Sequence, residues 1–318
     1  VAKEGGMGVL STAQIGYDDP DFAKNPEETN LRVLPEQIKK AKEIAGGNGM
    51  VAVNIMAVTQ LYETYVKTAC AAGVDAIISG AGLPTELPKF AEGYDVALAP
   101  IVSSTKSANV ILKFWDKKYH RTADFLVIEG PLAGGHLGFS KEQLEDIPSL
   151  DYDTEIQNII ALKQTYEEKY QTTIPVFVAG GMFTAKDAAH VMELGADGIQ
   201  AATRFVATEE CDASDAYKQA YVNASDDDVI IIKSPVGMPG RAIKNAFIER
   251  MLAAPDKISH CFNCLKACNP ATAPYCITQA LINAVVGDLD NGLIFCGSRV
   301  GEITKITTVP KLMQELTV

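Results

Sequence analysis

Short apolar runs, most of them bounded by Gly, Ser or Asn, recur along the first two thirds of the chain, and stretches with helical periodicity separate them. Runs that are apolar at consecutive positions predict strands buried on both faces, which is typical of a parallel sheet covered by helices. Alternation of such strands with helices predicts an α/β fold, either a barrel or a doubly wound sheet. Seven runs are present: Gly8–Ser11, Met50–Ile55, Asp75–Gly80, Val96–Val102, Phe125–Gly130, Ile174–Gly181 and Gly198–Phe205.

The segments between these runs support the alternation. Residues 35–45 carry an apolar face at Ile38, Ala41 and Ala45, which Leu34 extends, and residues 153–170 carry another, so both predict amphipathic helices. Further along, residues 212–223 and 240–254 also look helical. The loop over residues 233–240 holds two prolines and two glycines, which is typical of a shaped lid or cap.

The number of strands favours a barrel that is one strand short. A closed TIM (β/α)8 barrel has eight strands, and the opening residues 1–6 look like the last turn of a helix stopped by a glycine C-cap. We therefore expect a TIM barrel whose first strand and most of its first helix lie upstream of Val1; a seven-stranded open sheet is the alternative. The expected domains are a barrel at 1–208, a helical cap at 209–258 and a Cys-rich extension at 259–318.

Charge and hydropathy exclude several classes of partner. With 28 Lys and Arg against 40 Asp and Glu, the formal net charge is −12, which argues against nucleic acid and against an anionic membrane surface. No run approaches the roughly 18 apolar residues of a spanning helix, and no signal segment opens the chain. We expect a soluble, cytoplasmic protein, and we carry a homodimer as one expectation for its assembly.

Two consecutive strand ends predict a phosphate site. Gly180 and Gly181 end one strand directly before a helix that Thr184 could cap, so that bare N–H groups and the helix dipole favour an anion. The next strand offers Gln200 and Thr203, with the Arg204 guanidinium beside them. Glycines that merely turn the chain are the plain alternative, but two adjacent signals favour the phosphate, which α/β barrels commonly hold there.

His136 is the candidate acid or base. It follows the preceding strand within the segment Gly130-Pro-Leu-Ala-Gly-Gly-His-Leu-Gly138, whose glycines leave room for a planar ligand close to the imidazole. A lone histidine is more often structural, but the other three histidines lack a setting of this kind.

These motifs together resemble the nitronate monooxygenase family, formerly called 2-nitropropane dioxygenases, which shares fold and motifs with flavin-dependent enoyl-acyl-carrier-protein reductases. The resemblance runs from Gly5 to about Met251 with order and spacing preserved. The acidic residue frequent before Ala-Gly-Gly-His in the family is Leu132 here. The segments that carry the resemblance are residues 133–138, 179–181, 195–200, 203–205 and 235–242.

The resemblance implies a TIM barrel that binds FMN non-covalently, with the phosphate at Gly180, Gly181 and Thr203, and His136 facing the substrate as base or orienting group. The other cofactor-binding positions it implies are Asn54, Glu129, Gly134, Gly135 and Gln200. The implied reaction is oxidation of an alkyl nitronate by O2 through FMN, giving a carbonyl compound and nitrite. The alternative is reduction of an enoyl thioester with NAD(P)H.

A cysteine cluster lies outside these motifs. Cys261, Cys264, Cys268 and Cys276 have spacings suited to zinc or an iron–sulfur cluster, and buried, inert thiols are the alternative. These cysteines are the one feature in favour of a third hypothesis, a metal-stapled flavoprotein that transfers electrons or binds a partner. Cys296, in the run Leu293-Ile-Phe-Cys, is predicted to pack in a core.

Overall fold

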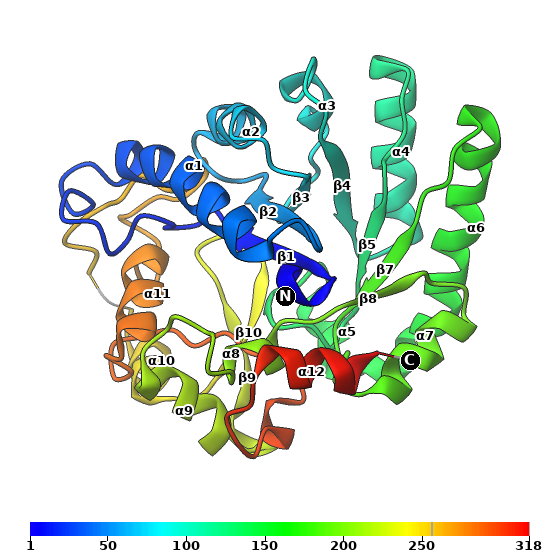
Figure 1. Ribbon diagram of the computed structural model, residues 1–318. Coiled ribbons are helices and arrows are strands. Elements are labelled where there is room, and N and C mark those ends of the chain that lie inside the picture. Colours follow the sequence, from blue (N-terminus) through cyan, green and yellow to red (C-terminus); the bar gives the residue numbers. More distant parts are fainter. Residues whose placement is uncertain (256, 318) are drawn as a thin grey trace. The chain divides into compact units, whose positions relative to one another are not determined.

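Parallel strands in sequential order form the main sheet of the computed structural model, which describes residues 1–255 and 257–317. The order in the sheet is β1-β2-β3-β4-β5-β7-β8, and each of the first four strands pairs in parallel with the next (Figure 1). The strands span Met7–Ser11, Met50–Met56, Ala76–Gly80, Ala97–Val102, Leu126–Glu129, Val176–Ala179 and Gly198–Gln200. All seven predicted strands are confirmed, and the fold is α/β with the strand order of a TIM barrel.

The chain divides into two units by its internal contacts. Unit 1 comprises Val1–Ile128, Tyr152–Val178 and Val191–Gly198, and unit 2 comprises Glu129–Asp151, Ala179–His190 and Ile199–Val318. The main sheet belongs to unit 1 except for the last residues of β5, β7 and β8, which unit 2 contains. The chain therefore passes from unit 1 to unit 2 near the carboxyl ends of β5, β7 and β8.

Strands β2 and β3 of unit 1 are largely buried, whereas β1 is not. All five residues of β3 are buried, and Val51, Ala52 and Val53 of β2 are at most 2% exposed. The buried Ser79 hydroxyl is satisfied, since it donates to the Ile55 carbonyl at 2.7 Å and lies 2.7 Å from the Tyr62 hydroxyl. The Ser79 hydroxyl is therefore buried without the free-energy penalty of an unsatisfied hydrogen-bonding group.

The helices predicted at residues 35–45 and 153–170 are present in unit 1 as α1 and α6, and α2, α3 and α4 were not predicted individually. Helices α1 and α2 pack against each other and against β2, and α4 packs against β4 and α6 (Figure 1). Helix α1 begins at Pro26, nine residues before the predicted start, because the buried face already includes Val33 and Leu34 and Pro35 is tolerated inside the helix. The helices are α1 (Pro26–Ala45), α2 (Tyr62–Ala71), α3 (Leu87–Phe90), α4 (Thr105–Tyr119) and α6 (Tyr152–Tyr170).

Three aspartates fix the amino-terminal edge of the sheet. Asp75 accepts a hydrogen bond from Val51 N at 2.7 Å, and Asp124 accepts one from Leu98 N at 2.7 Å. Asp197, directly before β8, accepts from Val176 N at 2.8 Å. With that edge held by structural carboxylates, functional side chains are expected from the opposite, carboxyl-terminal edge.

Unit 2 contains a second sheet that the sequence did not predict. It is antiparallel, with the order β6-β10-β9, and its strands are Gly135–His136, Pro239–Ile243 and Val229–Lys233. The helix predicted over residues 240–254 is therefore wrong for its first part: Gly240 to Ile243 pair with β9, and α10 (Ala246–Ala253) begins after Asn245. The run predicted as a strand to Phe205 is also too long, because α8 (Thr203–Val206) follows β8.

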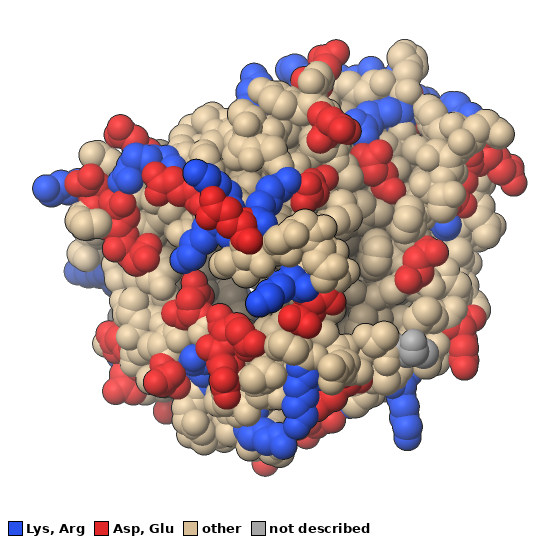
Figure 2. All heavy atoms as spheres, viewed as in Figure 1, with Lys and Arg blue, Asp and Glu red and all other residues tan. Residues whose placement is uncertain are grey.

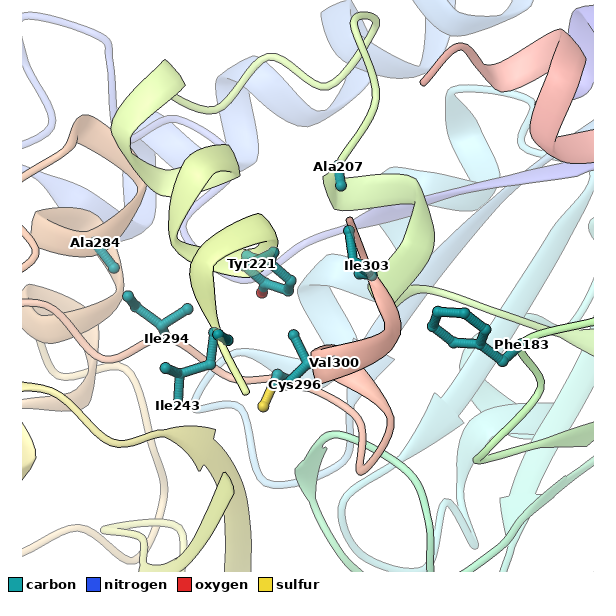
Figure 3. Close-up of a cluster of buried hydrophobic side chains, with 10 residues drawn as sticks. Phe183, Ala207, Tyr221, Ile243, Ala284, Ile294, Cys296, Val300 and Ile303 are labelled. Atoms are coloured by element: carbon teal, nitrogen blue, oxygen red, sulfur yellow. The ribbon is translucent and has the colours of Figure 1, made fainter. Parts of the chain in front are cut away.

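A hydrophobic cluster organises unit 2. Tyr221 of α9 (Asp215–Asn223), Ile243 and Ile294 meet there, and Cys296 is 2% exposed, which confirms its predicted packing role (Figure 3). The other helices of unit 2 are α5 (Lys141–Glu145), α11 (Ile277–Val286) and α12 (Val309–Leu316); α7 (Ala185–Glu193) starts in unit 2 and ends in unit 1. The domain boundaries proposed from the sequence stay a prediction.

The charged side chains on the surface and the apolarity of the helices bear on possible binding partners. On the face shown in Figure 2, basic side chains are interspersed with acidic ones. Of the helices in the described part of the chain, none combines the length and apolarity needed to cross a membrane.

Candidate functional site

One pocket of unit 2 gathers most of the residues predicted to hold the cofactor. Its walls come from the residues that follow β5, β7 and β8, together with the segment Gly297–Arg299. The predicted residues that line it are Glu129, Gly134, Gly180, Gly181, Gln200 and Thr203. Strand ends far apart in sequence therefore converge on one hollow, although the cofactor role of each residue is still a prediction.

The two glycines after β7 have the backbone conformation that only glycine adopts readily. Gly180 and Gly181 have φ values of 93° and 81°. A Cβ atom on Gly180 would lie 2.8 Å from the Gly130 carbonyl oxygen, and one on Gly181 would lie 2.9 Å from the Leu132 side chain. The turn thus packs directly on the loop after β5.

Helix α7 begins just after this turn. The Thr184 hydroxyl accepts a hydrogen bond from Asp187 N at 3.4 Å, and Asp187 in return accepts from Thr184 N at 2.6 Å. This reciprocal arrangement confirms Thr184 as the cap and leaves the helix start, with its positive dipole end, close in sequence to the pocket-lining Gly181, Met182 and Phe183.

Glu129 supplies a carboxyl group to the pocket. It is the last residue of β5, and burial raises the pKa of its carboxyl to about 7. A carboxyl with that pKa can carry a proton at neutral pH and so either donate or accept a hydrogen bond there.

His136 lies outside the residues that line the pocket. It sits in β6, where its backbone pairs with Gly240. The His136 Nε2 atom is 2.8 Å from the Ser234 hydroxyl, and the ring meets Phe295 edge-on with centroids 5.0 Å apart. Burial lowers the pKa of His136 to about 4, so the imidazole is neutral near pH 7.

The glycines beside His136 have two different structural reasons. A Cβ atom on Gly134 would lie 2.4 Å from the carbonyl carbon of Cys296, so the two backbones are in direct contact. Gly135 instead has a φ of 69° and no atom within 3.9 Å of its would-be Cβ. The loop is thin because it packs on the segment that follows Phe295, a contact that the sequence did not reveal.

The segment Gly297–Arg299 was missed by sequence reasoning. Gly297 N donates to the Thr203 hydroxyl at 2.9 Å, and Arg299 donates to the Gly181 carbonyl oxygen at 3.2 Å. The Ser298 hydroxyl is buried without a hydrogen-bond partner among the described residues. The available signal was an apolar run, Leu293 to Cys296, that ends in Gly-Ser like the other strand ends.

Arg204 lines the pocket but its guanidinium is engaged by protein groups. It donates to the Phe183 carbonyl oxygen at 2.8 Å and forms an ion pair with Glu315. Arg299 likewise pairs with Asp187 at 2.7 Å. The sequence expectation that Arg204 serves a phosphate directly is therefore not supported by its present contacts.

Asn54 belongs to unit 1 and is half-buried in β2. Its backbone pairs with Ser11 and Ile78, and its carbonyl oxygen accepts from the Thr12 hydroxyl at 3.0 Å. These contacts explain its place in the sheet, and its predicted role toward the cofactor stays a prediction.

The predicted metal site is not formed in the described residues. Within residues 1–255 and 257–317, no three His, Cys, Asp or Glu side chains are placed to hold a metal ion. Cys261 is exposed, whereas burial raises the pKa of Cys264 to about 11 and also raises the pKa of Cys268 and Cys276. The sequence spacing suited a metal, but the four thiols are buried to different extents, and in the described residues they do not come together as a set of ligands.

Comparison with known sequences gives one family. A sequence profile of the family described as nitronate monooxygenase matches residues 1–318. A probable nitronate monooxygenase of Staphylococcus aureus strain Newman is 25% identical over 270 residues, which cover 79% of this chain and 72% of the relative. A probable nitronate monooxygenase of Staphylococcus saprophyticus is 32% identical over 135 residues, 42% of this chain; the match spans only 36% of that relative's length.

The solved structures that are similar to this chain include the following two. FabK from Thermotoga maritima has a TM-score of 0.72 and 24% identity, with 99% of this chain and 85% of that chain covered. A nitroalkane oxidase from Streptomyces ansochromogenes has a TM-score of 0.67 and 18% identity, with 99% and 88% covered. At these identities the likeness establishes the fold, which is the TIM-type α/β fold that the sheet order indicates.

Proposed function

Because the chain belongs to the nitronate monooxygenase family, a family of oxidoreductase enzymes, we propose that it is an FMN-dependent oxidoreductase that oxidises alkyl nitronates with O2. The observation that carries this proposal is the convergence in unit 2: Glu129, Gly181 and Thr203, expected at the cofactor from three separate strand ends, line one pocket. The probable nitronate monooxygenases among its relatives support the nitronate as substrate.

The residues of the pocket fit the phosphate of FMN. The buried Ser298 hydroxyl lines the pocket and has no protein partner in the described chain, so it can donate to a ligand without losing an existing bond. The Gly180–Gly181 turn and the start of α7 add backbone N–H groups and a positive dipole end. Local donors of this kind suit a phosphate in a chain whose net charge is −12.

FMN and the protein would contribute different parts of the chemistry. When bound, FMN supplies the electron-transfer chemistry, and the protein supplies binding and orientation. Thr203, Ser298 and the Gly180–Gly181 turn would hold the phosphate. Glu129, with its pKa near neutrality, would hold or release a proton at a polar atom of the ligand, and the neutral His136 would orient the substrate.

The test uses the purified chain and begins with its absorption spectrum and FMN content. Stoichiometric FMN, with oxygen uptake and nitrite release on addition of ethylnitronate, is the expected result. Anaerobic bleaching of the flavin by NADH followed by reoxidation with crotonyl thioester would instead establish the enoyl reductase alternative. Absence of flavin from protein incubated with excess FMN would defeat both.

A further inference from the structure

Arg241 is a buried cation next to the pocket wall. The residue is 3% exposed and lies in β10, where its backbone pairs with Gly135 of β6. Its guanidinium donates to the Pro131 carbonyl oxygen at 2.9 Å and also to the Ala133 carbonyl oxygen. Among the described residues it forms no ion pair with a carboxylate. Burial of an unpaired charge is unfavourable, so a neutral donor would hold these two carbonyl groups at a lower free-energy cost.

The loop that Arg241 holds also provides backbone donors to the pocket. Leu132, Ala133 and Gly134 all line the pocket. The Ala133 N–H is engaged, because it donates to the Gly130 carbonyl oxygen at 3.2 Å. In the part of the chain that the structure describes, the N–H groups of Leu132 and Gly134 donate to no protein acceptor. Two donors are therefore available to a ligand.

Arg241 acts on the same two peptide groups as these donors. The Pro131 carbonyl and the Leu132 N–H belong to one peptide group, and the Ala133 carbonyl and the Gly134 N–H belong to another. Both groups are trans, which places each N–H opposite its carbonyl oxygen, so both N–H groups point away from the guanidinium. A hydrogen bond from a cation to the carbonyl end polarises the peptide group and makes its N–H a stronger donor.

The surroundings of the loop indicate that its donors serve an anion. A Cβ atom on Gly180 would lie 3.0 Å from Ala133 N, and one on Gly134 would lie 2.6 Å from Gly297 N. The loop thus contacts both the glycine turn after β7 and the segment that contributes the buried Ser298 hydroxyl, which has no partner in the described chain. Backbone N–H groups without protein acceptors commonly bind negatively charged oxygens.

We propose that Arg241 is a positioning residue that presents the Leu132 and Gly134 N–H groups to a negatively charged oxygen of the ligand in the pocket. The inference deepens the proposed function and rests on it, because the ligand is then FMN and the oxygen belongs to its phosphate or to a carbonyl of its ring. Arg241 is not among the residues that line the pocket. It acts through the two peptide groups, whose carbonyl oxygens it fixes and whose N–H groups it strengthens.

The first test observes one of the two donors alone in the wild-type chain. Pro131-Leu132 is the one Pro–Leu pair in the sequence, so ¹³C-carbonyl proline combined with ¹⁵N leucine selects the Leu132 amide. The flavin-free chain is titrated with FMN, with riboflavin and with inorganic phosphate. We expect saturating FMN to move the Leu132 amide proton downfield and to slow its exchange with deuterium about tenfold, the equivalent of one hydrogen bond.

The three ligands distinguish the two sources of the oxygen. A response to FMN and phosphate without a response to riboflavin assigns the acceptor to the phosphate. A response to FMN and riboflavin without a response to phosphate assigns it to the ring, and either result supports the proposal. A Leu132 amide proton that saturating FMN does not move would overturn it.

Variants test the part that Arg241 plays. Arg241→Met removes the charge and the donors, so it should raise the dissociation constant of FMN about tenfold and move the Leu132 amide proton upfield in the flavin-free chain. Arg241→Lys keeps the charge and should retain most of the affinity. Arg250→Met is the matched control, because Arg250 also donates to a backbone carbonyl, that of Asp290 at 3.2 Å, and does not line this pocket.

A folded Arg241→Met protein with the wild-type amide shift and FMN affinity would remove Arg241 from the proposal. If this variant does not fold, Arg241→Gln, which keeps a donor and removes the charge, takes its place. The Leu132 measurement on the wild type does not depend on either variant.

Failure of this inference is distinguishable from failure of the proposed function. A chain that binds FMN with the expected Leu132 response but does not consume ethylnitronate retains the inference and refutes the nitronate reaction. If the chain binds no flavin, the proposed function fails and the phosphate titration decides: a Leu132 response supports the anion site, and an unmoved Leu132 amide overturns it.

Discussion

Substitution of Gly134 or Gly135 by alanine tests why the loop beside His136 contains adjacent glycines. At Gly134 the new Cβ would lie 2.4 Å from the Cys296 carbonyl carbon and 2.6 Å from Gly297 N, and backbone atoms cannot rotate out of the way. At Gly135 the nearest atoms, in the Phe295 ring, are 3.9 Å away, but φ is 69°. The first substitution is therefore a steric change and the second a conformational one.

The two costs differ in size. Forcing an extra carbon into a packed region costs about 1–3 kcal/mol. Displacing Gly297 would also weaken the hydrogen bond from its N–H to Thr203, worth roughly 0.5–1.5 kcal/mol. The sum for Gly134→Ala is roughly 1.5–4.5 kcal/mol, whereas Gly135→Ala is expected to cost about 1–2 kcal/mol for a left-handed alanine.

Urea unfolding followed by far-ultraviolet circular dichroism measures these differences. Both variants and the wild type are compared at one protein concentration, without added FMN and again with FMN in excess. Gly134→Ala should also weaken FMN binding more than Gly135→Ala, because Thr203 and Gly297 both line the pocket. A Gly134→Ala protein no less stable than Gly135→Ala would refute the backbone contact as the reason for this glycine.

Three further predictions concern two residues of the pocket, Glu129 and Ser298, and His136 outside it. Burial raises the pKa of Glu129 in the folded chain from 4.5 to about 7, so folding favours the protonated form, and the free energy of unfolding decreases as the pH rises through that window. In urea titrations between about pH 5 and 7, Glu129→Gln should flatten this decrease. An unchanged slope would contradict the burial of the carboxyl. Ser298→Ala should raise the dissociation constant of FMN measured by fluorescence quenching by about tenfold, the value of one hydrogen bond, with little loss of stability; unaltered affinity would exclude Ser298 from the phosphate site. His136→Asn should retain FMN while nitronate turnover falls, and a wild-type rate would make His136 structural.

Local patterns were enough for the strands and for the residues at their ends. Seven apolar runs became the seven strands of the main sheet. For strands such as β3, burial on both faces leaves apolar residues at consecutive positions. The same reasoning located Thr184 as a helix cap and placed Gly180 and Gly181 at the end of a strand, where the structure gives both a positive φ. The prediction of a helix was wrong for Gly240 to Ile243, because these residues form a strand that is hydrogen-bonded to Val229–Lys233. The pattern of residues 240–243 alone did not indicate this pairing.

The candidate site was predictable in part for the same reason. Glu129, Gly181 and Thr203 follow strands, and parallel strands bring their carboxyl ends to one edge, so their convergence was foreseeable. Ser298 comes from a segment that follows the predicted motifs by more than fifty residues, and nothing local distinguishes its hydroxyl from an exposed one. The four clustered cysteines show the converse, since spacing alone suggested a metal site that the described residues do not form.

By itself the sequence determined the alternation of strand and helix, the family and the set of strand ends at which polar residues accumulate. Only the tertiary structure decided what His136 contacts, because Ser234 lies 98 residues away, in the loop between β9 and β10, and the pairing of β10 with β6 is non-local. It also decided that Gly134 is required by the backbone of Cys296. Periodicity reports which residues are buried, whereas the direction of a proton or the approach of two backbones depends on contacts between segments that local patterns do not encode.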